Sequence, residues 1–175
     1  MEAEYSSTHQ KTAQAQSVLN ALYEERSSAA DFLSFHLAKE LYGVAIQDVE
    51  EIRVWEQPTP IPHAPEFVKG VINMRGMIVP IIDLRIRFGV LPCEYLPTTV
   101  VLVLHCQQEE QQRVMGLVVD AVSDVIAQGE NVLFPAIGET TAASYLLGLL
   151  NVGDEVMSLL DTYELLDMQR ILGGE

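Results

Sequence analysis

Residues 70–83 read GVINMRGMIVPIID, and residues 148–161 read GLLNVGDEVMSLLD. A glycine, two apolar residues, an asparagine and a closing apolar pair with aspartate recur 78 positions apart. Upstream, GVAIQDVEEI at 43–52 matches GLVVDAVSDV at 116–125, 73 positions apart. The blocks keep the same order in both halves, so the sequence predicts a fold built from two similar units.

Each Gly-to-Asp block predicts two strands joined by a tight turn, because Asn and Gly readily adopt turn conformations. The closing aspartates, Asp83 and Asp161, are predicted N-caps of helical segments over 84–88 and about 162–171. The recurrence of Gly70 predicts a backbone conformation or close approach that a β-carbon cannot share. Gly70→Val should therefore cost on the order of 1 to 3 kcal/mol.

The rest of the chain supplies further short apolar or alternating runs between turn residues. Together they predict an all-β barrel or sandwich with minor helices. The runs are 32–37, 44–46, 51–55, 68–74, 77–82, 98–105, 114–119, 122–127, 145–152 and 156–160. Only Pro80 falls inside a run, so that strand is expected to lie at a sheet edge or to contain a bulge near Pro80.

The first 30 residues have a different composition, rich in Gln, Ser, Ala and Glu. Apolar residues at helical spacing predict a helix over about 10–26, in an N-terminal extension. We expect residues 31–175 to form the folded domain, with a first unit over about 31–91 and a second over about 98–161.

Charge and hydropathy narrow the function. The net charge of −15 over 175 residues argues against nucleic-acid binding, which needs phosphate neutralisation. Residues 53–87 nevertheless carry five basic against three acidic side chains, which suggests a partner-facing surface as readily as a solvated one. No run is long and apolar enough for a membrane span, and the N-terminus is unlike a secretory signal, so a cytoplasmic protein is expected.

No catalytic motif stands out in the sequence: it lacks a nucleophile elbow, a phosphate-binding glycine loop and a metalloprotease helix motif. Glu50 and Glu51 should point to opposite faces of a strand, and Cys93 and Cys106 form no metal-binding pair. We expect a protein that is not an enzyme, with no catalytic, cofactor-binding or metal-binding residues.

The two copies differ at the hairpin turn. Asn73-Met74-Arg75-Gly76 in the first corresponds to Asn151-Val152-Gly153-Asp154 in the second, so the basic tip belongs to one half only. We expect Arg75 to pair with Glu51 across neighbouring strands, and to help form a surface for a partner. An exposed apolar surface is expected beside it, and the candidate residues are Val49, Ile52, Val68 and Ile86.

Three segments carry a family resemblance: 67–88, with KGVINMRG and IVPIIDLR; 42–53; and 116–125. Over about 31–168 the chain resembles the CheW-like family of chemotaxis coupling proteins. The resemblance implies two five-stranded SH3-like β-barrels on a shared core. It also implies a non-enzymatic adaptor between transmembrane chemoreceptors and the regulatory domain of the histidine kinase CheA, recruited from the cytoplasm to receptor arrays.

The resemblance also implies a receptor-side contact surface at the Val-x-Glu-Ile strand and the hairpin. Its residues here are Val49, Glu51, Ile52, Gly70, Asn73, Arg75 and Gly76. A coupling protein for a pilus-based or other non-flagellar pathway would carry the same domain, and remains the alternative.

Overall fold

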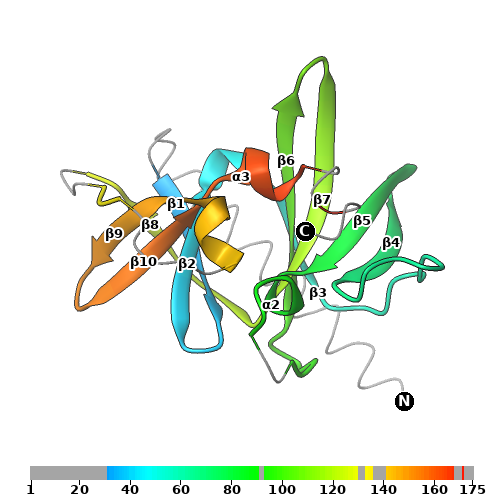
Figure 1. Ribbon diagram of the computed structural model, residues 1–175, viewed down its shortest axis with the longest axis horizontal. Helices are drawn as coiled ribbons and strands as arrows, with labels where there is room; N and C mark the ends of the chain where they lie inside the picture. The colour runs from blue at the N-terminus through cyan, green and yellow to red at the C-terminus, as the bar shows by residue number, and fades with distance from the viewer. Residues whose placement is uncertain (1–30, 91–92, 130–132, 136–140, 168–170, 172–175) are drawn as a thin grey trace.

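The computed structural model describes residues 31–90, 93–129, 133–135, 141–167 and 171, in which two five-stranded sheets form separate lobes (Figure 1). Sheet A contains β1 (Asp31–Leu37), β2 (Glu40–Ala45), β8 (Ala121–Ala127), β9 (Leu146–Val152) and β10 (Glu155–Leu160). Sheet B contains β3 (Val49–Val54), β4 (Val68–Met74), β5 (Met77–Asp83), β6 (Val100–Gln108) and β7 (Gln111–Val119). Each of the ten predicted runs overlaps a strand, and most differ from it by one to three residues at an end. The exception is the run predicted over 44–46, because β2 begins four residues earlier and Ile46 belongs to a 3₁₀ turn.

The two sequence copies exchange strands. The strand order is β8-β1-β2-β10-β9 in sheet A and β3-β6-β7-β5-β4 in sheet B. If the strands of each copy are numbered one to five, both sheets have the order three, one, two, five, four. In each sheet, strands one and two come from one copy, and strands three, four and five come from the other. The parallel pairs β2–β10 and β5–β7 join the copies. The units predicted over 31–91 and 98–161 therefore do not each form one sheet.

Three hydrophobic clusters hold this arrangement together. One lies within sheet B around Val79, Ile81 and Val103, and another within sheet A around Leu150 and Met157. The largest draws on both sheets, and its buried members come from β1, β2, β6 and β7 among other elements. Burial of apolar surface is the main stabilising term in folding. Because the largest cluster contains residues of both sheets, the two lobes share one core.

The short helices begin as predicted. Asp83 and Asp161 accept hydrogen bonds from the backbone N–H groups of Arg85 and Tyr163, as N-caps of α2 (Leu84–Arg87) and α3 (Thr162–Leu165). The second helix is shorter than the predicted 162–171, because α3 ends at Leu165, and residues 168–170 lie outside the described residues. The predicted helix over 10–26 also lies outside them.

The expectation of an edge strand at Pro80 is wrong, because β5 lies between β4 and β7. The parallel ladder to β7 begins only at Ile81, so the N–H that proline lacks is not needed there. The expected irregularity lies on the partner strand, where the register of β4 shifts between Val68 and Gly70.

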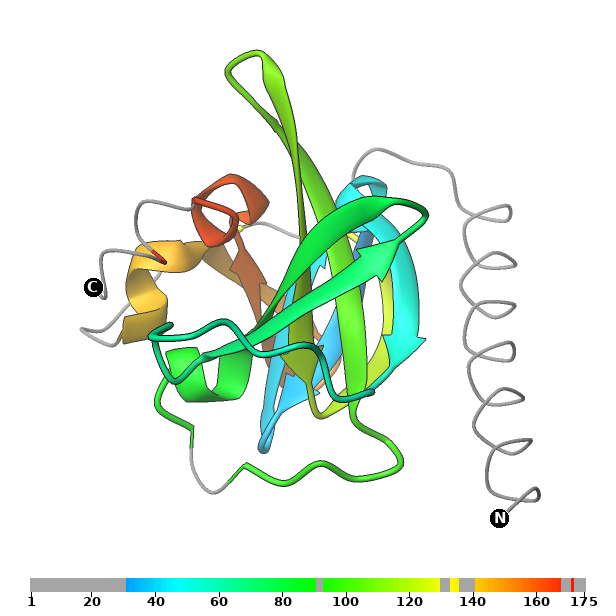
Figure 2. The ribbon, with the colours of Figure 1, turned by 90° about the vertical axis from the view of Figure 1, so that its right-hand side faces the viewer.

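Two 3₁₀ turns, Ile46–Asp48 (η1) and Thr141–Tyr145 (η2), complete the described elements. The β6–β7 hairpin projects from the body (Figure 2).

Candidate functional site

The candidate site lies at the seam between β3 and β4, the two outer strands of sheet B. Because the sheet curls, side chains from these outer strands meet. An Arg75 guanidinium nitrogen lies 2.5 Å from Glu51 Oε2, and Arg53 lies 3.4 Å from Glu51 Oε1. The predicted Arg75–Glu51 pair is confirmed, but it joins opposite edges of the sheet and not neighbouring strands.

The turn between β4 and β5 holds Arg75 in an unusual backbone conformation. Its φ is 53° and that of Gly76 is 84°, the positive pair typical of a type I′ hairpin turn. Asn73 Oδ1 accepts a hydrogen bond of 2.9 Å from the Gly76 N–H. Non-glycine residues seldom adopt positive φ, and the second copy has Gly153 at the equivalent position with a φ of 60°. Arg75 therefore occupies a position that glycine suits better.

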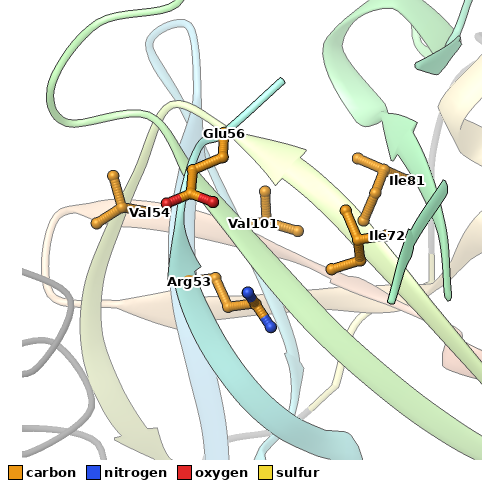
Figure 3. Close-up of a pocket in the computed structure, with 6 residues that line it drawn as sticks. All are labelled: Arg53, Val54, Glu56, Ile72, Ile81 and Val101. Atoms are coloured by element: carbon orange, nitrogen blue, oxygen red, sulfur yellow. The ribbon is translucent and has the colours of Figure 1, made fainter. Parts of the chain in front are cut away.

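A narrow cleft of about 20 Å³ opens along the same seam. Figure 3 shows Val101 with Ile72 and Ile81 on one side, and on the other the side chains at and just after the end of β3: Arg53, Val54 and Glu56. This volume is about that of one water molecule. The cleft is therefore too small to enclose a small-molecule ligand.

The seven predicted contact residues differ in exposure. Asn73, Arg75 and Gly76 are exposed at the hairpin turn, and Arg75 has 70% of its side-chain surface accessible. Val49 and Glu51 are partly buried in β3. Ile52 and Gly70 are buried, so neither offers a side chain to a partner.

Gly70 has a structural explanation. Its φ is +142°, and a β-carbon there would lie 2.1 Å from the Thr59 carbonyl oxygen. Thr59 forms an isolated antiparallel β-bridge with Val71 of β4. The Val71 N–H donates to the Thr59 carbonyl oxygen at 2.8 Å, and the Thr59 N–H donates to the Val71 carbonyl oxygen at 3.0 Å. The second copy repeats the device, with Phe134 bridging Leu149 beside Gly148. The close approach predicted from the recurrence of this glycine is confirmed.

The exposed apolar residues beside the turn differ from those expected. Val49, Val68 and Ile86 pack against the shared core, and Ile52 belongs to it. Met77 and Ile78 are instead 44% and 63% exposed, directly after Gly76. Alternation along β5 would have identified Ile78, whose neighbour Val79 is fully buried.

A second group of side chains was missed because it depends on the segment between the two copies. Tyr95 stacks on Trp55 with ring centroids 4.3 Å apart, and Lys69 lies 5.7 Å from the Tyr95 ring centre. Tyr95 is 40% exposed and Leu96 is 52% exposed. Neither belongs to a strand or repeat block, so no periodic signal identified them.

Four ionisable side chains considered from the sequence are Glu50, Glu51, Cys93 and Cys106. Glu50 lies 3.7 Å from His105, whereas Glu51 faces Arg75, so the adjacent glutamates have separate partners. Burial raises the pKa of the Cys93 and Cys106 thiols, which favours their unreactive protonated forms. Within the described ranges, no three His, Cys, Asp or Glu side chains gather as a metal site would require.

No helix in the described part of the chain is both long and apolar enough to cross a membrane.

Comparison with known proteins places this geometry in a family. The family model for the CheW-like domain matches residues 31–170. Chemotaxis protein CheW of Klebsiella aerogenes is 43% identical over 143 residues, covering 81% of this chain and 84% of the relative. Chemotaxis protein CheW of Rhizobium meliloti is 33% identical over 144 residues, covering 81% and 90%.

A solved structure agrees with the fold. The crystal structure of scaffolding protein TtCheW from Thermoanaerobacter tengcongensis aligns with a TM-score of 0.68 and 34% identity, covering 77% of this chain and 86% of that one. The prediction of two SH3-like barrels is confirmed. The chain belongs to the CheW-like domain family, a family of non-catalytic chemotaxis scaffold proteins.

Proposed function

We propose that this scaffold couples transmembrane chemoreceptors to the regulatory domain of a CheA-type histidine kinase, and that it meets the receptor at the β3–β4 seam. The observation that carries the proposal is Arg75. It is exposed and holds a positive φ of 53° where the other copy has glycine. A backbone conformation of this kind costs stability without improving packing, and such positions cluster at functional sites.

The charge of the seam supports the same surface. Arg53 lies on β3, Lys69 on β4 and Arg75 in the turn after β4. These three basic side chains outnumber the acidic Glu51 and Glu56 of the same seam, in a chain whose net charge is −15. A local positive surface on an acidic protein steers encounter with an acidic partner, whereas apolar contact supplies most of the affinity. Met77 and Ile78 provide that apolar contact beside the turn.

The proposed receptor surface therefore consists of Val49, Glu51, Asn73, Arg75 and Gly76, extended by Met77 and Ile78. Ile52 and Gly70 act beneath it, since both are buried. Binding to the receptor tip and kinase would bring the protein to membrane-associated arrays.

The test compares Arg75→Glu, Glu51→Arg and the double swap. Arg113→Glu, at the exposed start of β7, is the matched charge control. Arg75→Glu should weaken binding to receptor cytoplasmic tips at least tenfold, yet lower the free energy of unfolding by no more than about 1 kcal/mol, because an exposed ion pair contributes little. The double swap should recover stability but only part of the receptor affinity.

Unchanged receptor affinity in Arg75→Glu would remove Arg75 from the interface. Strictly additive losses in the double swap would show that the ion pair has no energetic coupling. A separate pull-down with the kinase regulatory domain tests the other partner. Failure of both pull-downs with chemotaxis partners, but capture by receptors and kinase of a pilus-based pathway, would establish the alternative.

A further inference from the structure

The described chain passes between the two sheets at only two places. One is η1, between β2 and β3, and the other is the single residue Asp120, between β7 and β8. The repeat relates these crossovers, because Gln47 in η1 corresponds to Asp120. Any change in the orientation of one barrel relative to the other must be accommodated at these points.

Asp120 is bonded from both sides of its crossover. Its N–H donates to the carbonyl oxygen of His36 at 3.1 Å, and its Oδ2 accepts from the N–H of Ala38 at 2.6 Å, both in the β1–β2 hairpin of sheet A. Its Oδ1 accepts a hydrogen bond of 2.9 Å from Arg85. Arg85 lies in α2, which directly follows β5 of sheet B. One carboxylate thus joins the two barrels.

Arg85 is only 1% exposed, and its guanidinium has several partners. It donates to both carboxylate oxygens of Asp83, at 3.0 and 2.9 Å, and to the carbonyl oxygen of Glu94 at 2.7 Å. The Tyr95 hydroxyl donates to Asp83 at 2.8 Å. The same cluster therefore also holds the segment that joins the two copies.

The electrostatics favour a charged Arg85 despite its burial. Desolvation alone lowers the pKa of the guanidinium, but the hydrogen bonds and charges of Asp83 and Asp120 outweigh it and raise the pKa. A buried charge needs such partners, because removing one of them leaves the desolvation penalty unopposed. The positions of Asp83 and Asp120 around the Arg85 guanidinium are consequently restricted.

The other crossover has no equivalent. Tyr163 stands where the repeat would place a second Arg85, and it is 50% exposed. Gln47, which stands in place of Asp120, is also exposed. The α3 side of the molecule instead buries Leu165 and Leu166 in the shared core. The polar link is specific to the crossover at Asp120.

We propose that Arg85 is a positioning residue that clamps the crossover at Asp120 and so fixes the orientation of the two barrels relative to each other. The inference rests on the fold and does not depend on the proposed partners. Apolar contacts of the shared core hold the barrels together but are weakly directional. The hydrogen bonds of Arg85 to both oxygens of Asp83 and to Asp120 at the crossover are directional, so they fix the orientation of the barrels.

The test uses the full chain with Arg85→Met and Asp120→Asn, with Gln47→Asn as the matched control at the other crossover. Residual dipolar couplings report the orientation of each sheet, and amide hydrogen exchange reports local opening. In the wild type and in Gln47→Asn, couplings from both sheets should fit one alignment tensor. In Arg85→Met they should need two, and exchange at the Ala38 and Asp120 amides should rise at least tenfold.

Amides in the β6–β7 ladder should change less than threefold in the same variants. A uniform rise across all strands, with one tensor retained, would show general destabilisation and overturn the proposal. Asp120→Asn keeps the Arg85–Asp83 pair, but it removes the carboxylate charge and leaves one acceptor oxygen for two donors, Arg85 and the Ala38 N–H. It therefore carries the test if Arg85→Met does not fold. Wild-type couplings and exchange in Asp120→Asn would also overturn the proposal.

Discussion

Replacing Gly70 with alanine tests how the crossing segment is fixed against β4. The new β-carbon would lie 2.1 Å from the Thr59 carbonyl oxygen and 2.6 Å from its carbonyl carbon, well inside van der Waals contact. Residue 59 can retreat only by losing its two backbone hydrogen bonds with Val71, which measure 2.8 and 3.0 Å. Each such bond contributes about 0.5–1.5 kcal/mol to stability.

The backbone conformation adds a second cost. A φ of +142° is strained for any residue with a β-carbon, at about 1–3 kcal/mol. Together these effects predict a loss of about 4 kcal/mol, above the range expected from the sequence. For a domain of this size that corresponds to a decrease in Tm of about 10 to 15 °C.

Two other glycines separate the contributions. Gly148→Ala meets the same kind of crossing segment, with Phe134 O at 2.6 Å but no positive φ, and should cost about 1–3 kcal/mol. Gly153→Ala has a φ of +60° and nothing within 4 Å, and should cost about 1 kcal/mol. Thermal and urea unfolding measure all three. If Gly70→Ala costs no more than Gly153→Ala, residue 59 is not held against β4 and the reasoning fails.

A shortened chain starting at Ala30 should keep its Tm within a few degrees, because all described strands begin at or after Asp31; a much lower Tm would mean that the extension covers barrel surface. Asp161→Ala should cost about 1 kcal/mol and Asp161→Asn much less, with equal losses contradicting a capping role. Since burial raises the pKa of Cys93 and Cys106, the folded state retains protons that the unfolded state releases, and stability should fall as pH rises from about 8 to 10. In a variant with both cysteines replaced by serine, the stability measured over the same pH range should fall less steeply. An equal slope in the two proteins would exclude the thiols as the cause.

Much of the site could be predicted because it depends on local sequence. The recurring Gly70 and Gly148 marked two close backbone approaches, and the Arg-Gly step at the turn marked the exposed Arg75. The partner of Arg75 was also predicted, but its position across the seam was not. That contact depends on the curl of sheet B, which brings β3 and β4 together at its two outer edges.

The sequence by itself determined the ten strands, the two aspartate caps and the existence of a repeat, because turn residues, alternation and capping act over a few neighbouring positions. Only the tertiary structure decided that the copies exchange strands through β2–β10 and β5–β7. Similar copies present similar strand edges, so local pattern cannot distinguish pairing within a copy from pairing between copies. The choice is made by long-range burial in the shared core, and the same topology brings Asp120 to Arg85.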